Sequence, residues 1–388
     1  QEHTRVRLLG WLAQALYWTD QGERRHRLSR EALEAARRTG DPTVIAHALH
    51  SLHVALWGPR HLEDLRAAAE EMLELGRSLG DRDIQLKAYT WLITDALQTD
   101  PIEVADGYIE DYARLAEELH RPYLLGYAES MRAARAHLEG RFDDMLRSMA
   151  AQLAHSEEAD ALRAQEAHRW QRGLLLLDLG RVDDVLVDDL ADLAACHPGL
   201  TFGVMSVLAQ VTVDRLDEAR VELAGLVPDD LASIPRDCMW AGTLAMLSRV
   251  VCALGAVEYA RPLYDLLATF GERNAVWGSG FIIFGPVSGY LGMLATTFGE
   301  PDVALGHLEH ALERSRQLGS PPLVARTRVE MARALLARRS EGDAERARSL
   351  LEDARGVASD LGMASLAAEA DHLAAIDRAQ HAKLPERP

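Results

Sequence analysis

Residues 285–319 read GPVSGYLGMLATTFGEPDVALGHLEHALERSRQLG. On both sides of the break FGEP, apolar residues recur at three- and four-residue spacing, which is typical of amphipathic helices. The first segment carries the pair Leu291-Gly292. The second repeats small or apolar residues on one helical face: Ala304, Leu308 and Ala311. Because small residues let two helices approach closely, the stretch predicts a tightly packed helical hairpin.

The offsets in this hairpin match those of a tetratricopeptide repeat, and the second-helix spacing returns in the next unit as Ala347, Leu351 and Ala354. Glycine follows the predicted helix ends at regular intervals, as expected for left-handed helix caps. These glycines are Gly40, Gly80, Gly319 and Gly362. Their separation indicates a repeating unit of about forty residues that holds two helices.

Nearly every other stretch shows the same helical periodicity, and alternating β-branched segments are nearly absent. The sequence therefore predicts an all-α fold, a tetratricopeptide-like right-handed superhelix of about nine helical hairpins with a capping helix. We expect one repeat domain over residues 1–380 and a tail over 381–388. The predicted hairpins cover residues 5–40, 43–80, 82–120, 122–156, 158–197, 199–226, 231–271, 285–319 and 321–361, and the last helix covers 363–380.

Composition excludes several classes of function. The chain has 388 residues and a formal net charge of −18. We expect no direct contact with nucleic acid, because nucleic-acid affinity comes mainly from Lys and Arg contacts to phosphate. Lys87 and Lys383 are the only lysines, and neither follows a glycine-rich loop, which argues against a phosphate-binding loop, a kinase or a Schiff-base enzyme. Three cysteines without CxxC spacing and the lack of a long apolar run predict a cytoplasmic protein with no membrane span.

The segment 274–292, NAVWGSGFIIFGPVSGYLG, is rich in glycine and aromatic residues. It lacks the Lys-Ser/Thr pair of a phosphate loop and the GxSxG pattern of a nucleophile elbow. If a helix begins at Gly285, then Gly289 and Gly292 continue a small-residue stripe that lets a neighbouring helix or a ligand come near the backbone. A helical interpretation of the preceding residues puts Trp277, Phe281 and Phe284 on one face.

Three stretches carry a resemblance to a known family: residues 285–337, RRTGDPTVIAHALHSLHVALWGP and PRDCMWAGTLAMLSRVVCALG. They resemble the degenerate tetratricopeptide region of large bacterial ATP-dependent signalling regulators. These include LuxR-family transcriptional activators of the maltose-activator type and related adenylate or guanylate cyclases. The resemblance covers essentially the whole chain. It implies a parent protein with an N-terminal nucleotide-binding domain and often a C-terminal DNA-binding domain, although the motifs of both are absent from this sequence.

These observations predict a non-catalytic sensor or coupling module that binds a small effector or a segment of a partner protein on a concave face. We expect no enzyme activity, no cofactor and no metal, because no nucleophile or acid–base pair converges in the sequence. The spacing of His47, His50 and His53 differs from that of zinc-binding helices. Two alternatives stay open, namely a scaffold that oligomerises through its end hairpins and an enzyme with a pocket in the helical array.

First helices of such hairpins usually line the concave face, which nominates Trp57, Trp91, Trp170, Trp240 and Trp277. The segments PRDCMW and RNAVWGSGF both open a hairpin with a polar head followed by tryptophan. We therefore predict a ligand site composed of Arg236, Trp240, Arg273, Asn274, Trp277, Phe281 and Gly285. The alternative is that both tryptophans are buried between hairpins and that the arginines cap helix ends.

Overall fold

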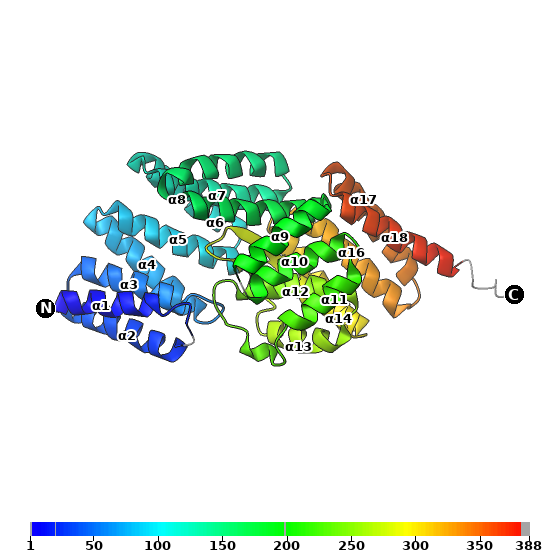
Figure 1. Cartoon of the computed structure of the whole chain (residues 1–388), viewed down its shortest axis with the longest axis horizontal. Helices are drawn as coiled ribbons and strands as arrows, with labels where there is room; N and C mark the ends of the chain where they lie inside the picture. The colour runs from blue at the N-terminus through cyan, green and yellow to red at the C-terminus, as the bar shows by residue number, and fades with distance from the viewer. Residues whose placement is uncertain (1, 20, 198, 382–388) are drawn as a thin grey trace.

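The computed structural model describes residues 2–19, 21–197 and 199–381, so the predicted tail lies outside this part of the chain from residue 382 onward. Within the described residues there are eighteen α-helices, one short 3-10 helix and one two-stranded sheet. The helices follow one another as antiparallel hairpins, and the two termini lie at opposite ends of the array (Figure 1). The predicted all-α superhelix is confirmed.

The first three hairpins lie close to the predicted boundaries, and the fourth begins as predicted but ends later. They are formed by α1 (Glu2–Ala15) with α2 (Gly22–Thr39), α3 (Pro42–Leu56) with α4 (Leu62–Leu79), α5 (Arg82–Thr99) with α6 (Ile102–Leu119), and α7 (Pro122–Glu139) with α8 (Phe142–Leu179). The predicted break near residues 156–158 is wrong. Helix α8 runs through it and also forms a hairpin with α9 (Asp184–Cys196), because neither glycine nor proline interrupts its sequence there.

The later hairpins also agree with the predicted ranges. They are α10 (Leu200–Thr212) with α11 (Leu216–Leu226), α12 (Trp240–Leu254) with α13 (Val257–Ala268), α14 (Val287–Thr297) with α15 (Pro301–Gln317), and α16 (Pro321–Arg338) with α17 (Asp343–Asp360). A short 3-10 helix, η1 (Leu231–Ser233), precedes α12, and α18 (Ala364–His381) is the final helix.

The predicted glycine caps are confirmed. Gly40, Gly80, Gly319 and Gly362 have φ angles of 67°, 65°, 60° and 72°, in the left-handed region that glycine adopts without steric cost. Where Asp follows the glycine, it caps the next helix. The Asp81 carboxylate, for example, accepts a hydrogen bond from the backbone N–H of Ile84 at 3.0 Å. The turn sequence thus ends one helix and begins the next.

The opening sequence stretch packs as the repeat spacing predicts. Ala304, Leu308 and Ala311 of α15 are fully buried. A Cβ atom added at Gly292 of α14 would lie only 2.4 Å from the Leu308 side chain. Close approach of the two helices therefore depends on the glycine.

The segment 274–286 is a β-hairpin, which corrects the helical interpretation of these residues. Strand β1 (Asn274–Trp277) pairs antiparallel with β2 (Ile282–Pro286). Gly278 and Gly280 form the turn with φ angles of 58° and 93°. Gly285 has a φ of 91° within β2, and helix α14 begins only at Val287. Hydrogen bonds between the paired strands, joined by a turn of positive-φ glycines, satisfy the backbone N–H and C=O groups that a helix was expected to satisfy.

This β-hairpin lies on the inner side of the superhelix, against the first helices of several hairpins. Strand β1 contacts α5 and α12, whereas β2 contacts α7, α12 and α14 and also the second helix α15. A Cβ atom at Gly285 would lie 2.6 Å from Leu323 of α16. Helices α16 and α18 also contact α7 and α8. The superhelix therefore curves back on itself, and the β-hairpin fills part of its concave side.

Candidate functional site

The residues predicted from sequence as a ligand site lie around the β-hairpin. Trp240 and Trp277 belong to one core cluster, with exposed fractions of 2% and 5%. The Arg236 guanidinium carbon lies 5.4 Å from the centre of the Trp240 ring, which is cation–π distance. The structure thus places Arg236 over Trp240 and encloses both indole rings in one core cluster.

The polar members of that set bind backbone carbonyl groups of the N-terminal hairpins. The Asn274 amide donates to the Leu97 carbonyl at 2.9 Å, and Arg273 donates to the Pro59 carbonyl at 2.7 Å. The Phe281 ring contacts Tyr127 edge-on, with 5.0 Å between ring centres. These contacts hold the β-hairpin against the N-terminal half of the chain. Ligand binding by the same residues stays a prediction.

The other nominated tryptophans are also enclosed. Trp91 and Trp170 are buried. Trp57 is half-buried at the end of α3, with its ring 5.1 Å from that of Trp91. Trp277 lies on a strand and not on a first helix. The predicted aromatic lining of the concave face is therefore part of the packing between hairpins.

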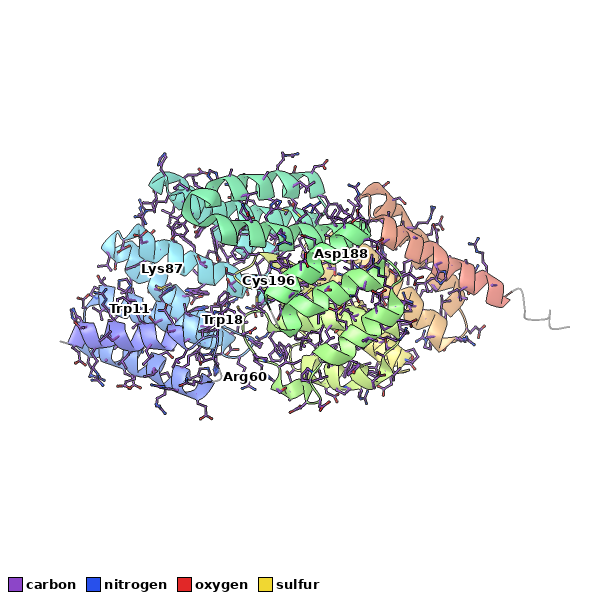
Figure 2. All side chains as sticks on the ribbon, in the orientation of Figure 1. Trp11, Trp18, Arg60, Lys87, Asp188 and Cys196 are labelled. Carbon is purple, nitrogen blue, oxygen red and sulfur yellow. The ribbon has the colours of Figure 1, made fainter. Side chains whose placement is uncertain are left out.

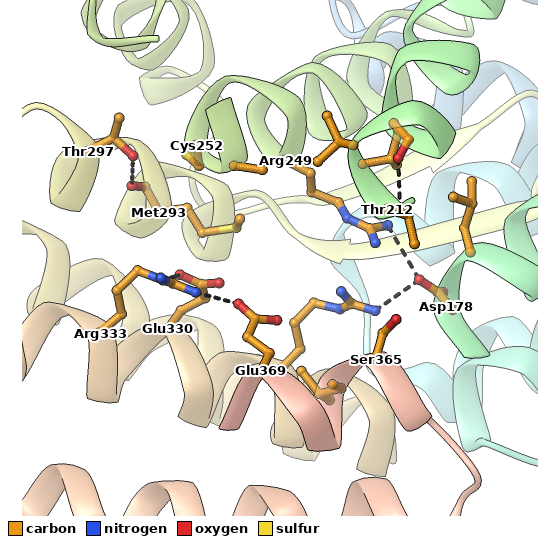
Figure 3. Close-up of a pocket in the computed structure, with 16 residues that line it drawn as sticks. Asp178, Thr212, Arg249, Cys252, Met293, Thr297, Glu330, Arg333, Ser365 and Glu369 are labelled. Carbon is orange, nitrogen blue, oxygen red and sulfur yellow. Dashed lines mark hydrogen bonds and ion pairs between the residues drawn. The ribbon is translucent and has the colours of Figure 1, made fainter. Parts of the chain in front are cut away.

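A separate pocket lies on the concave side in the C-terminal half (Figure 3). Its volume is ≈460 Å³, and the first helices α10, α12, α14 and α16 contribute to its wall, together with α8 and α18. A volume of this size suits a small molecule. The pocket is lined by Leu177, Asp178, Leu208, Val211, Thr212, Arg249, Cys252, Ala253, Met293, Thr297, Arg326, Glu330, Arg333, Ser365, Leu366 and Glu369.

Asp178 of α8 is the centre of one charged cluster in the pocket wall. One carboxylate oxygen accepts hydrogen bonds from Arg326 at 2.9 Å and from Arg249 at 3.3 Å. The other oxygen lies 2.9 Å from Nε2 of His137. Burial alone would raise the pKa of Asp178, but the pairing with Arg326, His137 and Arg249 outweighs burial and holds that pKa below its usual range. Asp178 is therefore a carboxylate at neutral pH.

This Asp178 cluster joins elements that are far apart in the sequence. It connects α7 and α8 to α12 and α16 through one carboxylate. Asp178, Arg249 and Arg326 also line a second cavity of ≈30 Å³, whose opposite wall includes Ile282 and Phe284 of β2. The cluster consequently lies between the main pocket and the β-hairpin.

A second charged cluster occupies another part of the wall, as Figure 3 shows. Arg333 of α16 pairs with Glu330 at 3.3 Å and with Glu369 of α18. Burial and the nearby Glu369 raise the pKa of Glu330, and the attraction of Arg333 opposes this shift only partly. Within the described residues no ion pair joins the two clusters, which lie one helical turn apart on α16.

The pocket also contains one thiol and several hydroxyl groups. Burial raises the pKa of Cys252 to about 12, so this thiol is protonated at neutral pH and is a weak nucleophile. Thr212 and Thr297 donate their hydroxyl hydrogens to backbone carbonyl groups of their own helices. The arrangement offers fixed charges and hydrogen-bond donors, which suits binding and orientation of a charged ligand more than bond cleavage.

Sequence reasoning missed this pocket, although a signal for it exists. Arg249 is the only charged residue in α12, and Asp178 follows four leucines in LLLLDLG. A lone charge within an apolar helical segment is costly to bury unless it is paired. Each such residue therefore predicts a partner on another helix, but the sequence does not say which one.

Across residues 2–19, 21–197 and 199–381, no group of His, Cys, Asp and Glu side chains has the geometry to hold a metal ion. His53 lies 3.3 Å from Asp95 and stacks on Trp91, and His50 accepts a hydrogen bond from the Trp91 indole N–H. No helix in the described part of the chain is long and apolar enough to span a bilayer.

Comparisons with known proteins were made on sequence and on structure. No family model matches the chain, and no curated protein matches it. Among solved structures, yeast Tom70 matches over 100% of this chain and 98% of that chain, with 11% identity and a TM-score of 0.38. A circular tandem repeat protein matches over 98% and 96%, with 14% identity and a TM-score of 0.21. Naa15/Naa10 bound to HypK-THB matches over 91% and 64%, with 15% identity and a TM-score of 0.22. These TM-scores are too low for any of the matches to support an argument about ligand or partner.

Proposed function

We propose that this chain is a non-catalytic binding and coupling module that takes a small effector into the concave pocket. The observation that carries the proposal is the pocket itself. It is ≈460 Å³ in volume, lies where the first helices converge, and has paired charged side chains in its wall. Charged groups in such a position give a ligand a fixed orientation at low entropic cost.

Coupling follows from the position of the Asp178 cluster. A ligand that binds Arg249 or Arg326 competes for, or reinforces, their hydrogen bonds to Asp178. Those bonds connect the middle of the superhelix to its C-terminal hairpins. Because a ligand shifts an equilibrium only through contacts that differ between two states, this cluster is the element through which binding would change the curvature of the array.

The wider role is part of the same proposal. The chain would act as the sensor arm of a cytoplasmic bacterial signalling or transcriptional regulator. Its partners would then be an N-terminal nucleotide-binding domain and a C-terminal DNA-binding domain of the parent protein. The resemblance of the repeat segments to such regulators supports this role, and the formal net charge of −18 fits a chain that leaves nucleic-acid contact to another domain.

A second location for the ligand stays proposed as well. Arg236, Arg273 and the residues of the β-hairpin could meet a ligand if the hairpin moved away from α5. The buried Trp277 indole N–H and the side-chain amide oxygen Oδ1 of Asn274 have no hydrogen-bond partner within the described residues, which supports some exchange of contacts there. A pocket of ≈330 Å³ lies beside Arg236, between α2 and the loop that follows α3, but Arg273, Asn274 and Trp277 do not line it. We therefore place this location second.

The scaffold alternative has one specific observation in its favour. Leu8, Trp11 and Trp18 on the N-terminal hairpin are 57%, 56% and 69% exposed, and Figure 2 shows both tryptophans at the surface. Exposed aromatic side chains are enriched at protein interfaces. A Trp11→Arg variant that changes the molar mass measured by light scattering would favour a scaffold that assembles through this end.

A thermal-shift screen tests the proposed effector site. We expect at least one small charged metabolite to raise the melting temperature, since a ligand at 100 times its dissociation constant adds about 2.7 kcal/mol of stability. Arg326→Gln should abolish the shift. Arg328→Gln is the matched control, because Arg328 lies on the same helix, pairs with Asp353 at 3.7 Å and is not part of the pocket wall. A shift that survives Arg326→Gln would contradict the proposed location.

A further inference from the structure

The two charged clusters of the pocket wall have excess charge of opposite sign, and this difference specifies the class of ligand. We propose that the pocket recognises a small zwitterion, whose anionic group pairs with Arg249 and Arg326 and whose cationic group pairs with Glu330 and Glu369. The inference rests on the proposed effector-binding function and names its ligand chemistry.

The Asp178 cluster has an excess of positive charge. Two guanidinium groups share a single carboxylate, and the other oxygen of that carboxylate is taken by His137. The side chains of Arg249 and Arg326 are only 15% and 22% exposed. Within the described residues, each guanidinium donates one hydrogen bond to Asp178, so most of its five N–H groups are free for a ligand. A carboxylate or phosphate oxygen would satisfy these donors and neutralise the excess charge.

The Arg333 cluster has the opposite excess. Here two carboxylates, from Glu330 and Glu369, share a single guanidinium. The Glu330 side chain is 10% exposed and that of Glu369 is 37% exposed, so Glu369 is the more accessible of the two acceptors. An ammonium group beside Glu369 would add hydrogen bonds and favour the charged form of Glu330.

The pocket as a whole is balanced, since three arginines face three carboxylates. A ligand with a net charge would therefore gain at one cluster and be repelled at the other, whereas a zwitterion gains at both. Arg326 and Glu330 are four residues apart on α16, which corresponds to a rise of about 6 Å along the helix axis. The pocket lining also includes the apolar side chains of Met293 and Leu366. These features suit an aliphatic spacer between the two charged groups of the ligand.

Calorimetric titration of the full chain with a series of ω-amino acids tests the inference. The series is glycine, β-alanine, γ-aminobutyrate and ε-aminocaproate, and caproate and hexylamine serve as singly charged probes of matched length. We expect one of the longer amino acids to bind at least about tenfold more tightly than both singly charged probes. Equal or tighter binding of caproate or hexylamine would overturn the zwitterion inference and leave the effector pocket in place, as would the failure of every amino acid in the series to bind.

Variants that replace a charged side chain with a neutral one test the binding of the two charged ends of the ligand separately. Glu369→Gln should weaken binding of the best amino acid about tenfold while caproate binding stays the same or improves, an asymmetry that general destabilisation does not produce. Glu352→Gln, on the exposed face of α17, is the matched control and should change neither. If Glu369→Gln weakens binding of the best amino acid and of caproate equally, the ammonium group does not bind at Glu369 and the inference fails. The proposed function fails separately, if no charged metabolite gives a shift that Arg326→Gln abolishes.

Discussion

Replacing Gly292 with alanine tests whether the glycines of α14 serve close helix packing. The added Cβ atom would lie 2.4 Å from Cγ of Leu308 and 3.1 Å from the carbonyl oxygen of Ala304. Both residues belong to α15 and are fully buried, so neither can move into solvent to relieve the overlap. Gly292→Ala should therefore force α14 away from α15.

The expected magnitude follows from two opposing contributions. Alanine in a helix interior is more favourable than glycine by about 0.5–1 kcal/mol. Overpacking of a well-packed core costs about 1–3 kcal/mol, and an overlap that involves backbone belongs in the upper part of that range. We expect Gly292→Ala to lower the free energy of unfolding by about 1–2 kcal/mol, the difference between these two contributions.

Two other glycines of the same hairpin supply matched controls. No atom lies within 4 Å of a Cβ added at Gly306, which is exposed on α15. At Gly289 the nearest atom is the Cβ of Ala311 at 3.6 Å, an ordinary contact distance. Alanine at either position should raise stability by about 0.5–1 kcal/mol, because only the helix preference changes.

Urea unfolding followed by far-UV circular dichroism gives the comparison, provided that the slope of the transition is unchanged. Repeat arrays can unfold in parts, so the stability of this hairpin should also be measured locally. Hydrogen exchange of the amides in α14 and α15 should rank the variants in the same order of stability as urea unfolding does. A Gly292→Ala protein as stable as Gly306→Ala would refute the close-packing argument. Leu308→Ala should cost less in the Gly292→Ala background than alone, since it removes the atoms that overlap.

The remaining predictions concern charge, burial and reactivity. Asp178→Asn should lower stability by about 2–4 kcal/mol at neutral pH, because it leaves two guanidinium groups in the pocket wall without a carboxylate. Since the pKa of Asp178 is lower in the folded than in the unfolded state, its contribution is fully present above the unfolded pKa of about 3.9 and is lost progressively as the pH falls from there toward the folded pKa. The stability difference between parent and variant in urea titrations should therefore shrink as the solution becomes more acidic. Trp277→Ala should cost about 3 kcal/mol, as for other buried aromatic residues, whereas Arg236→Ala should cost under about 1 kcal/mol; the reverse order of melting temperatures would contradict the burial of the β-hairpin. A thiol reagent at neutral pH should label the exposed Cys196 (Figure 2) quickly and Cys252 slowly, and equal rates would contradict the protonated state of the buried thiol. The isolated chain should neither hydrolyse ATP nor bind duplex DNA at physiological salt, and salt-dependent micromolar binding of DNA in a filter or fluorescence assay would show this to be wrong.

Local signals in the sequence were sufficient for the helices and their order. The turn glycines Gly40, Gly80, Gly319 and Gly362 ended helices as predicted, because a positive φ is a property of the single residue. The alanine and leucine spacing of α15 predicted the buried face, because helix geometry places residues three and four apart on the same side. One helix boundary was predicted wrongly. In α8 the forty-residue repeat spacing suggested a helix end that the local sequence does not contain.

The β-hairpin depended on contacts that are distant in the sequence. Residues 274–286 combine apolar periodicity compatible with a helix and glycines compatible with a turn, so the local preference was ambiguous. The strands are held in place by α5, α7, α12, α14 and α15, as in the hydrogen bond from Asn274 to Leu97. Such short strands gain stability from the surfaces that cover them, which the sequence of the segment does not encode.

The pocket was decided by the curvature of the whole array. By itself the sequence determined that the chain is a series of helical hairpins, and that charges such as Asp178 and Arg249 stand in apolar segments and need partners. Only the tertiary structure decided that Asp178 meets Arg326, which is 148 positions later in the chain. Small rotations between successive hairpins add up over several repeats, so the neighbours across the concave side depend on all of the intervening interfaces and on no single segment.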